Sequence, residues 1–416
     1  MESLLNFYTN KITDLNKQIE VQKSKTNRIF YSRLFLFIAA LGLFFYFIGN
    51  HNTTATITAI ITIITFLILL RLEITISRKI TFLQNLIKVN EIEIDLLKGN
   101  YEKLNEGKEF IDKHHNFIAD LDIFGRRSIF QILNRTSTYS GRIKLAGWLT
   151  MPFLDGNEIV KRQDAVKDLS GKPEWCQHFI ALGITNKEEA ADKDAIQDWL
   201  NEANYFSNTF LKVVSALLPL LTIIALGLYS FNFTSSSAFT ILFFVQLLIV
   251  GSHTKKVNQI HNQLSRKFDS IEKYRSLISL IESEQFNSSE LNSLKDNFKN
   301  SKEGASKDIQ KLKKHVDTLD ARMNIVVALL LNGILLWDIN VMRNIEKWKN
   351  EHKSNFLKWI DIIGEFDAFI SIGLYGYNNS NYTYPKIYTN SFVLETEDIG
   401  HPLINKKGYL PLLLYP

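Results

Sequence analysis

Few residues in this chain have the types and spacings that a catalytic or metal site requires. Two histidine groups stand out, His114 with His115 and His253 with His261, but no carboxylate follows any of them three or four residues further along. A metal site built on a helix would need further ligands at that spacing. The sequence therefore predicts solvated helix residues at these four positions.

Two carboxylate pairs have the chemistry of an acid and a base: Asp120 with Asp122, and Asp317 with Asp320. Ion-paired helix ends are the favoured interpretation of both. The one cysteine, Cys176, excludes a disulfide scaffold and a thiolate zinc site, and it is predicted to be an inert helix residue. The sequence contains no Ser-His-Asp signature and no dinucleotide-binding fingerprint.

The composition is that of a folded protein whose apolar residues are concentrated in a few runs. The 416 residues are 46% hydrophobic and 22% charged, which excludes a disordered or collagen-like chain. The net charge of +5 is too small to indicate nucleic-acid binding by itself. The lysine-rich segment 295–314 also holds Asp296, Glu303 and Asp308, so it is interpreted as a solvated face.

Four long apolar runs are arranged as two hairpins, at residues 29–49 and 55–71 and again at 210–229 and 238–251. A helix needs about 20 apolar residues to cross a bilayer, so each run predicts one transmembrane helix. Arg33 is the one charge in the first run, near its start. The alternative is two hydrophobic hairpins buried in the core of a soluble protein.

The basic residues set the predicted orientation in the membrane. Lys and Arg precede the first run and follow the second, and Lys212, Lys255 and Lys256 flank the second hairpin, whereas neither short turn within a hairpin contains Lys or Arg. Positive charge marks the cytoplasmic side. We therefore expect a multi-pass protein of the cell (inner) membrane, with both termini and the large segments in the cytoplasm and Asn52 and Asn232 outside.

Helical patterning continues outside these runs. Apolar residues recur at spacings of three and four over residues 4–19 and 72–87, which predicts that the two flanks pair as an antiparallel coil. Residues 257–281 continue the fourth run as an amphipathic helix, and the pattern breaks over 287–306. A helix over residues 307–350 is expected to include the apolar run 325–337, too short to span and therefore predicted to be buried.

The stretch from Asp120 to Leu169 carries a distinctive series of short motifs. In order, they are Ser128-Ile-Phe130, Leu133-Asn-Arg-Thr136, Gly141-Arg142, Trp148-Leu149, Pro152 and Arg162-Gln163-Asp164. By its chemistry the series is architectural: Arg135 can pair with a carboxylate or cap a helix, and Gly141 permits a tight helix start. Trp148 is expected to be buried against the helix that carries Leu336 and Trp337.

This series resembles the start of the core domain of the MutS DNA mismatch-repair family, most closely a membrane-associated branch. Later segments fit the returning core helices and the approach to the ATPase domain, so that the similarity covers about residues 120–404. These segments are Leu319–Asn324, Leu336-Trp337-Asp338-Ile339, Glu346-Lys347-Trp348, Gly364–Ala368 and Gly400-His401-Pro402. The resemblance implies a structural core motif and the start of an ATPase domain. The core motif comprises Arg135, Gly141, Arg142, Trp148, Arg162, Gln163, Trp337 and Trp348, and the ATPase start comprises Gly400, His401 and Pro402.

The predicted fold is mainly α: a MutS-like helical core and lever domain with two transmembrane hairpins, four membrane helices in all. The N-terminal helix, first hairpin and following helix occupy 1–106, and the core begins at 107–209. The second hairpin at 210–251 interrupts the core, which returns over 252–386. Residues 387–416 would begin an ATPase domain, truncated or divergent.

The resemblance implies binding of mismatched DNA, ATP-dependent DNA repair, a homodimer, and double-stranded DNA as a partner beside the lipid bilayer. ATP and Mg belong to the full-length family, but the phosphate-binding pattern G-x-x-x-x-G-K-[ST] does not occur in this sequence. No cofactor, metal or catalytic residue is therefore assigned to the chain itself. The alternative is a non-catalytic membrane scaffold that uses the core for dimerisation and coupling.

Overall fold

A computed structural model describes residues 2–47, 53–185, 190–300, 303–388, 395–396 and 400–403, and every regular element in these ranges is a helix. The helical prediction is therefore confirmed. The α-helices are α1 (Glu2–Phe47), α2 (Thr53–Leu97), α3 (Ile129–Leu133), α4 (Tyr139–Thr150), α5 (Gly156–Ser170), α6 (Pro173–Gly183), α7 (Ala190–Asn201), α8 (Thr209–Ser230), α9 (Ser237–Ser283), α10 (Ser289–Asp296), α11 (Ala305–Asp320), α12 (Ile325–Leu335) and α13 (Trp337–Asn378). Short 3-10 turns are η1 (Lys108–Phe110), η2 (Asn297–Asn300) and η3 (Ala321–Met323).

The chain forms two compact units. The first comprises residues 1–137, 145–185 and 367–416, and the second comprises 138–144 and 186–366. Helices α4 and α13 each carry residues of both units. The five-part division expected from the sequence stays a prediction.

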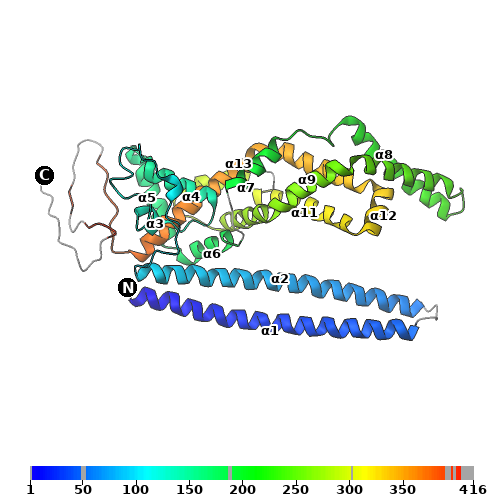
Figure 1. The fold of residues 1–416 in the computed structure, drawn as a ribbon, viewed down its shortest axis with the longest axis horizontal. Coiled ribbons are helices and arrows are strands. Elements are labelled where there is room, and N and C mark those ends of the chain that lie inside the picture. Colours follow the sequence, from blue (N-terminus) through cyan, green and yellow to red (C-terminus); the bar gives the residue numbers. More distant parts are fainter. Residues whose placement is uncertain are drawn as a thin grey trace. The chain divides into compact units, whose positions relative to one another are not determined.

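In the first unit, α1 and α2 form a long antiparallel hairpin (Figure 1). Near the N-terminus of α1 and the C-terminus of α2 the facing side chains are buried, among them Tyr8, Leu15, Leu83 and Leu86. The predicted antiparallel coil is therefore confirmed. Towards the turn, apolar side chains such as Phe35 are exposed instead.

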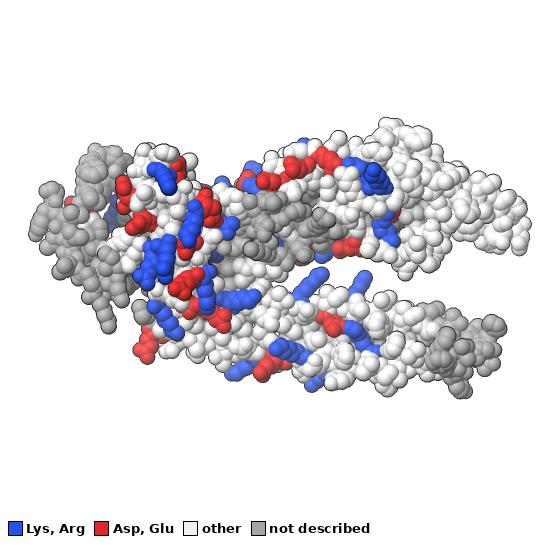
Figure 2. Space-filling model, in the orientation of Figure 1, with Lys and Arg blue, Asp and Glu red and all other residues white. Residues whose placement is uncertain are grey.

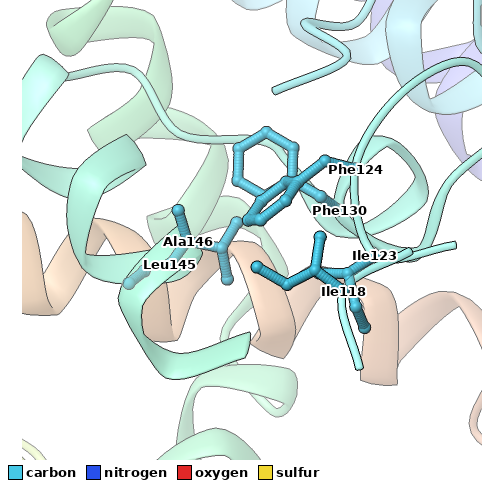
Figure 3. Packing of buried hydrophobic residues seen from close by; sticks show 7 residues of the cluster. Ile118, Ile123, Phe124, Phe130, Leu145 and Ala146 are labelled. Atoms are coloured by element: carbon cyan, nitrogen blue, oxygen red, sulfur yellow. The ribbon is translucent and has the colours of Figure 1, made fainter. Parts of the chain in front are cut away.

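A compact apolar cluster forms the rest of the first unit's core. Phe124 and Phe130 pack with ring centroids 5.3 Å apart, and Leu145 and Ala146 of α4 lie beside them (Figure 3). Ala368 supplies the contribution of α13. Gly107, at a φ of 67°, passes so close to both rings that a Cβ there would lie 2.7 Å from Phe130.

The second unit is organised around α9, a helix of 47 residues. Its first part pairs with α8, and its later part packs along α11. His261 on α9 is buried, and its Nε2 lies 2.9 Å from a carboxylate oxygen of Asp320 on α11. The prediction that His261 is solvated is therefore wrong, whereas the ion-paired helix end expected for Asp320 is confirmed.

The expected continuous helix over 307–350 is also wrong. The chain leaves α11 through η3, α12 is bent by 113° relative to α11, and Leu336 then takes a left-handed conformation with a φ of 47° before α13 begins. Asn324 caps α12 because its side chain accepts hydrogen bonds from the backbone N–H groups of Val326 and Val327. Such a cap starts a new helix in place of continuing the old one.

The apolar run in α12 is not buried as predicted. Of its residues, Asn332 and Gly333 are buried, whereas most of the apolar side chains are exposed. The periodicity of the run could not reveal this difference, because nearly every position of α12 is apolar.

Three helices in the described parts are long and apolar enough to cross a membrane, at Ile57–Leu97, Thr209–Ser230 and Ser237–Leu264. The bent pair α11 and α12 would add a fourth if it formed one span. The expected first span at 29–49 extends beyond the described residues, and Asn52 lies outside them. Membrane insertion therefore stays a prediction, now supported by three of the four expected helices.

Candidate functional site

A buried ion pair between Arg135 and Glu93 is the centre of the candidate site. The Nε of Arg135 donates to Oε1 of Glu93 at 2.7 Å, and Nη2 donates to Oε2 at 3.1 Å. The two side chains are only 3% and 1% exposed. The prediction that Arg135 pairs with a carboxylate is confirmed, and the two parallel bonds fix the orientation of the guanidinium.

Local sequence places Arg135 at the end of α3. Ser128 caps the start of this five-residue helix by accepting from the backbone N–H of Gln131. The third nitrogen of Arg135, Nη1, donates to the backbone carbonyls of Ile132 and Leu133 at 2.9 and 3.2 Å. These carbonyls lie at the C-terminus of α3, where such groups lack partners within the helix and attract positive charge. Arg135 therefore caps the helix as well as pairing with Glu93.

Two more side chains extend the ion pair to α13 and α1. The amide nitrogen of Asn378 donates to Oε2 of Glu93 at 2.6 Å, and the hydroxyl of Tyr8 donates to Oδ1 of Asn378 at 2.7 Å. Burial, together with the negative charge of Glu93, raises the pKa of the Tyr8 hydroxyl. The hydroxyl is therefore protonated, as its role as a donor requires.

The backbone after α3 is also held by α13. The backbone N–H of Arg135 donates to the hydroxyl of Ser371 at 2.9 Å, and that of Ser137 donates to the carboxylate of Asp367 at 2.9 Å. Asp367 and Ser371 are fully buried. We refer to Tyr8, Glu93, Arg135, Ser371 and Asn378 together as the polar joint.

The polar joint connects several helices of the first unit. Its members come from α1, α2, the segment after α3 and α13, so that four parts of the first unit meet at one buried charge pair. Among the described residues no group of three or more His, Cys, Asp or Glu side chains could hold a metal ion. A buried network with defined partners can fix one arrangement of the elements that carry it.

A second cluster surrounds Arg162 of α5. Its guanidinium carbon lies 3.6 Å from the ring centroid of Phe153 and 4.2 Å from that of Trp148. Trp148 is half-buried, and its ring centroid lies 4.6 Å from that of Phe369 on α13. The expected helix, α13, is confirmed as the partner of Trp148, whereas the expected burial of the indole is wrong because it is only partial.

The other predicted core-motif residues make contacts of their own within each unit. In the second unit, Gly141 donates its backbone N–H to the hydroxyl of Thr138 in the first turn of α4, and the guanidinium of Arg142 lies over the Tyr139 ring at 5.4 Å. Gln163, in the first unit, donates to the carbonyl of Pro385 at 2.9 Å.

Two predicted tryptophans of the second unit have architectural roles. The indole nitrogen of Trp337 donates to the carbonyl of Thr318 at 3.2 Å, and that of Trp348 donates to the carbonyl of Asp308 at 2.7 Å. Both bonds fasten α13 to α11. Gly400, His401 and Pro402 are exposed, and their assignment to the start of an ATPase domain stays a prediction.

Sequence reasoning missed Tyr8, Glu93 and Asn378. A signal for Glu93 exists in the sequence, because Leu86, Asn90 and Glu93 follow one another at spacings of four and three on one helix face, where a charge among buried residues requires a partner. Tyr8 lies in an apolar stripe in which its hydroxyl had no visible partner. The partners come from distant parts of the chain.

The surface charges do not form a site of one sign on the face in view, where Lys and Arg are interspersed with Asp and Glu (Figure 2). In the segment 295–314, Lys299 lies 2.7 Å from Asp296 and Lys311 lies 2.7 Å from Glu303. Its interpretation as a solvated, ion-paired face is confirmed for these lysines.

Comparison with protein families gives a match over the core region. A family model described as MutS domain III matches residues 115–372, which is more than half of the chain. Comparisons with curated proteins and with solved structures gave no match. Arg135 and Ser371 lie inside the matched range, whereas Tyr8, Glu93 and Asn378 lie outside it.

Removing the charge of Glu93 should destabilise the first unit strongly. The Glu93→Gln variant leaves Arg135 buried without a counter-charge, which typically costs about 3–5 kcal/mol. Urea unfolding of the purified protein in detergent measures this loss. Replacing both partners by Glu93→Leu and Arg135→Met should recover part of it, because no unpaired charge remains.

The matched control is Lys17→Ala, which removes an exposed pair in which Lys17 lies 4.0 Å from Asp14. We expect a change of about 0–1 kcal/mol there. Equal effects of Glu93→Gln and Lys17→Ala would contradict the role assigned to the polar joint.

Proposed function

The chain belongs to the MutS family through its domain III, and from this premise we propose that it is a membrane-anchored member of this DNA-repair family. In this proposal domain III transmits movement between the membrane hairpins and a nucleotide-driven ATPase. The chain's own residues supply the connection, and ATP hydrolysis with Mg would require an ATPase domain that carries the phosphate-binding pattern not found in this sequence.

The polar joint is the observation that carries the proposal. It fastens two helices outside the matched range, α1 and α2, to residues of the family region. Asn378, the last residue of α13, takes part in it, and in the family resemblance the chain then continues towards the ATPase. A rigid element shared by two functional parts can couple their movements.

Exposure of apolar side chains supports insertion of the first hairpin. Ile57, Ile61 and Ile64 on α2 are all more than half exposed, as lipid-facing residues of an isolated structure would be. Arg33 forms an ion pair with Glu73 on α2, and its guanidinium lies 5.5 Å from the ring centroid of Phe66. The charge that opens the first predicted span is thereby neutralised within the hairpin.

The second hairpin has its own polar contact. Gln246 of α9 and Thr222 of α8 are fully buried, and the amide of Gln246 donates to the hydroxyl of Thr222. Hydrogen bonds of this kind hold helices together in lipid, where apolar surfaces supply no driving force for association. The polar pair is therefore suited to fixing the register of two membrane helices.

The orientation follows the basic residues, with the termini and the domain III core in the cytoplasm of a multi-pass inner-membrane protein. By family membership we also propose a homodimer and double-stranded DNA as a partner at the cytoplasmic face. In the family resemblance, members that recognise mismatches carry an N-terminal domain with a wedge, whereas the first predicted membrane hairpin precedes domain III here, so we expect no preference for a mismatch.

Labelling of engineered cysteines tests the topology. In a Cys176→Ser background, Ser235→Cys in the turn between α8 and α9 should react with a membrane-impermeant thiol reagent in intact cells. Ser3→Cys at the start of α1 should react only after the cells are opened. Both serines are exposed, so accessibility within the protein is matched. Labelling of Ser3→Cys but not Ser235→Cys in intact cells would reverse the orientation, and equal protection of both would refute the exposed turn.

The salt dependence of DNA binding tests the DNA partner. Detergent-purified protein should bind duplex DNA, with or without a mismatch. Because binding to phosphates releases counterions, the affinity should fall steeply as the salt is raised from 50 to 200 mM. Absence of binding at low salt would contradict this part of the proposal and favour the non-catalytic scaffold.

A further inference from the structure

Helix α12 presents an apolar surface that no described part of the chain covers. Ile325, Val326 and Leu330 are 74%, 61% and 53% exposed, and the preceding Met323 is 80% exposed. The sequence from Met323 to Trp337 contains no charged residue. Exposed apolar surface of this kind marks a contact with a partner or a membrane.

The opposite face of α12 packs against the second hairpin. Helix α12 packs against α8 and α9, and a Cβ on Gly333 would lie 2.2 Å from the ring of Phe243 on α9. A side chain at position 333 would require the Phe243 ring to move. Helix α12 is therefore held against the hairpin that we propose to lie in the membrane, with its apolar side exposed.

The length and direction of α12 exclude a complete crossing by this helix. Its 11 residues extend about 16 Å, about half of the hydrocarbon thickness. Because α11 runs along α9 and α12 is bent by 113° relative to α11, α12 crosses the hairpin instead of following it (Figure 1). An apolar helix in this position would lie in the plane of the membrane.

Polar contacts close both ends of α12. Asn324 caps its first turn, and Oδ1 of Asn332 accepts from the backbone N–H of Asp338 at 2.9 Å. Arg322 lies 3.2 Å from the carboxylate of Asp338, so the charges that flank the helix neutralise each other. Backbone and side-chain polar groups satisfied in this way reduce the cost of entering lipid.

The residues that flank α12 contact the cytoplasmic end of the hairpin, whereas Gly333 within α12 contacts Phe243, six residues after the start of α9. Asp320, just before it, contacts His261 in the later part of α9, and Asn340, just after it, donates to the carbonyl of Ser215 near the start of α8 at 3.1 Å. In the proposed topology both of these hairpin positions lie towards the cytoplasm.

We propose that α12 is a membrane-embedded helix that lies across the hairpin without spanning the bilayer, and that its exposed face contacts lipid acyl chains. The inference rests on the proposed membrane insertion of α8 and α9. It would give the domain III core a lipid contact besides the hairpins, located where α11 passes into α13.

Fluorescence quenching tests the proposal. Full-length Cys176→Ser protein carrying Leu330→Cys is labelled with a bimane fluorophore and reconstituted in vesicles of phosphatidylethanolamine and phosphatidylglycerol. Leu221→Cys on α8 is the matched hairpin position, since Leu221 and Leu330 are 48% and 53% exposed. Lys314→Cys on α11 is the solvent control, and Val326→Cys provides a second label on α12.

Brominated lipid should quench the two α12 labels by a fraction similar to that at Leu221→Cys, and iodide should quench mainly Lys314→Cys. Quenching of the α12 labels by iodide, with Leu221→Cys still quenched by lipid, would overturn the inference and leave the membrane hairpin in place. Absence of lipid quenching at Leu221→Cys would overturn both. Protection of the α12 labels from both quenchers, with cross-linking between chains, would assign the face to a second copy instead.

Discussion

The ion pair of Glu93 with Arg135 is the constraint on which the first unit depends. A charge removed from water must be neutralised and hydrogen-bonded where it lies, so each partner fixes the other. Glu93 draws Arg135 and Asn378 to one point on α2, and Asn378 in turn accepts from Tyr8 on α1. Independent movement of these elements would expose or separate the buried charges. The elements are the N-terminal part of α1, the C-terminal part of α2, the segment after α3 and the end of α13.

A different constraint acts on the apolar helices. Many of their apolar side chains on α2, α8 and the first part of α9 are exposed among the described residues. Within a hairpin, the polar contacts that remain are internal, as with Gln246 and Thr222. The chain therefore combines a domain III region fixed by buried polar contacts with hairpins whose outer surface suits lipid, which is the physical basis of the proposed anchoring.

Local patterns in the sequence were sufficient to predict much of this structure. Periodicity predicted the coil of α1 and α2, and the basic side chain of Arg135 predicted a carboxylate partner. The sequence could not identify that partner as Glu93, because Glu93 precedes Arg135 by 42 residues and only tertiary packing brings the two together. The left-handed conformation of Leu336 could not be predicted, because position 336 is neither glycine nor proline. Hydrophobicity alone could not show whether α12 is buried or exposed, because nearly all of its residues are apolar.

Amide hydrogen exchange, compared between the parent protein and Glu93→Gln, tests most directly whether the polar joint couples its elements. If it does, exchange should accelerate together in peptides that contain Tyr8, Glu93 and Asn378, on three different helices, while α10 in the second unit is unchanged. An increase confined to α2 around Glu93, with the peptides of α1 and α13 protected as in the parent, would contradict the account.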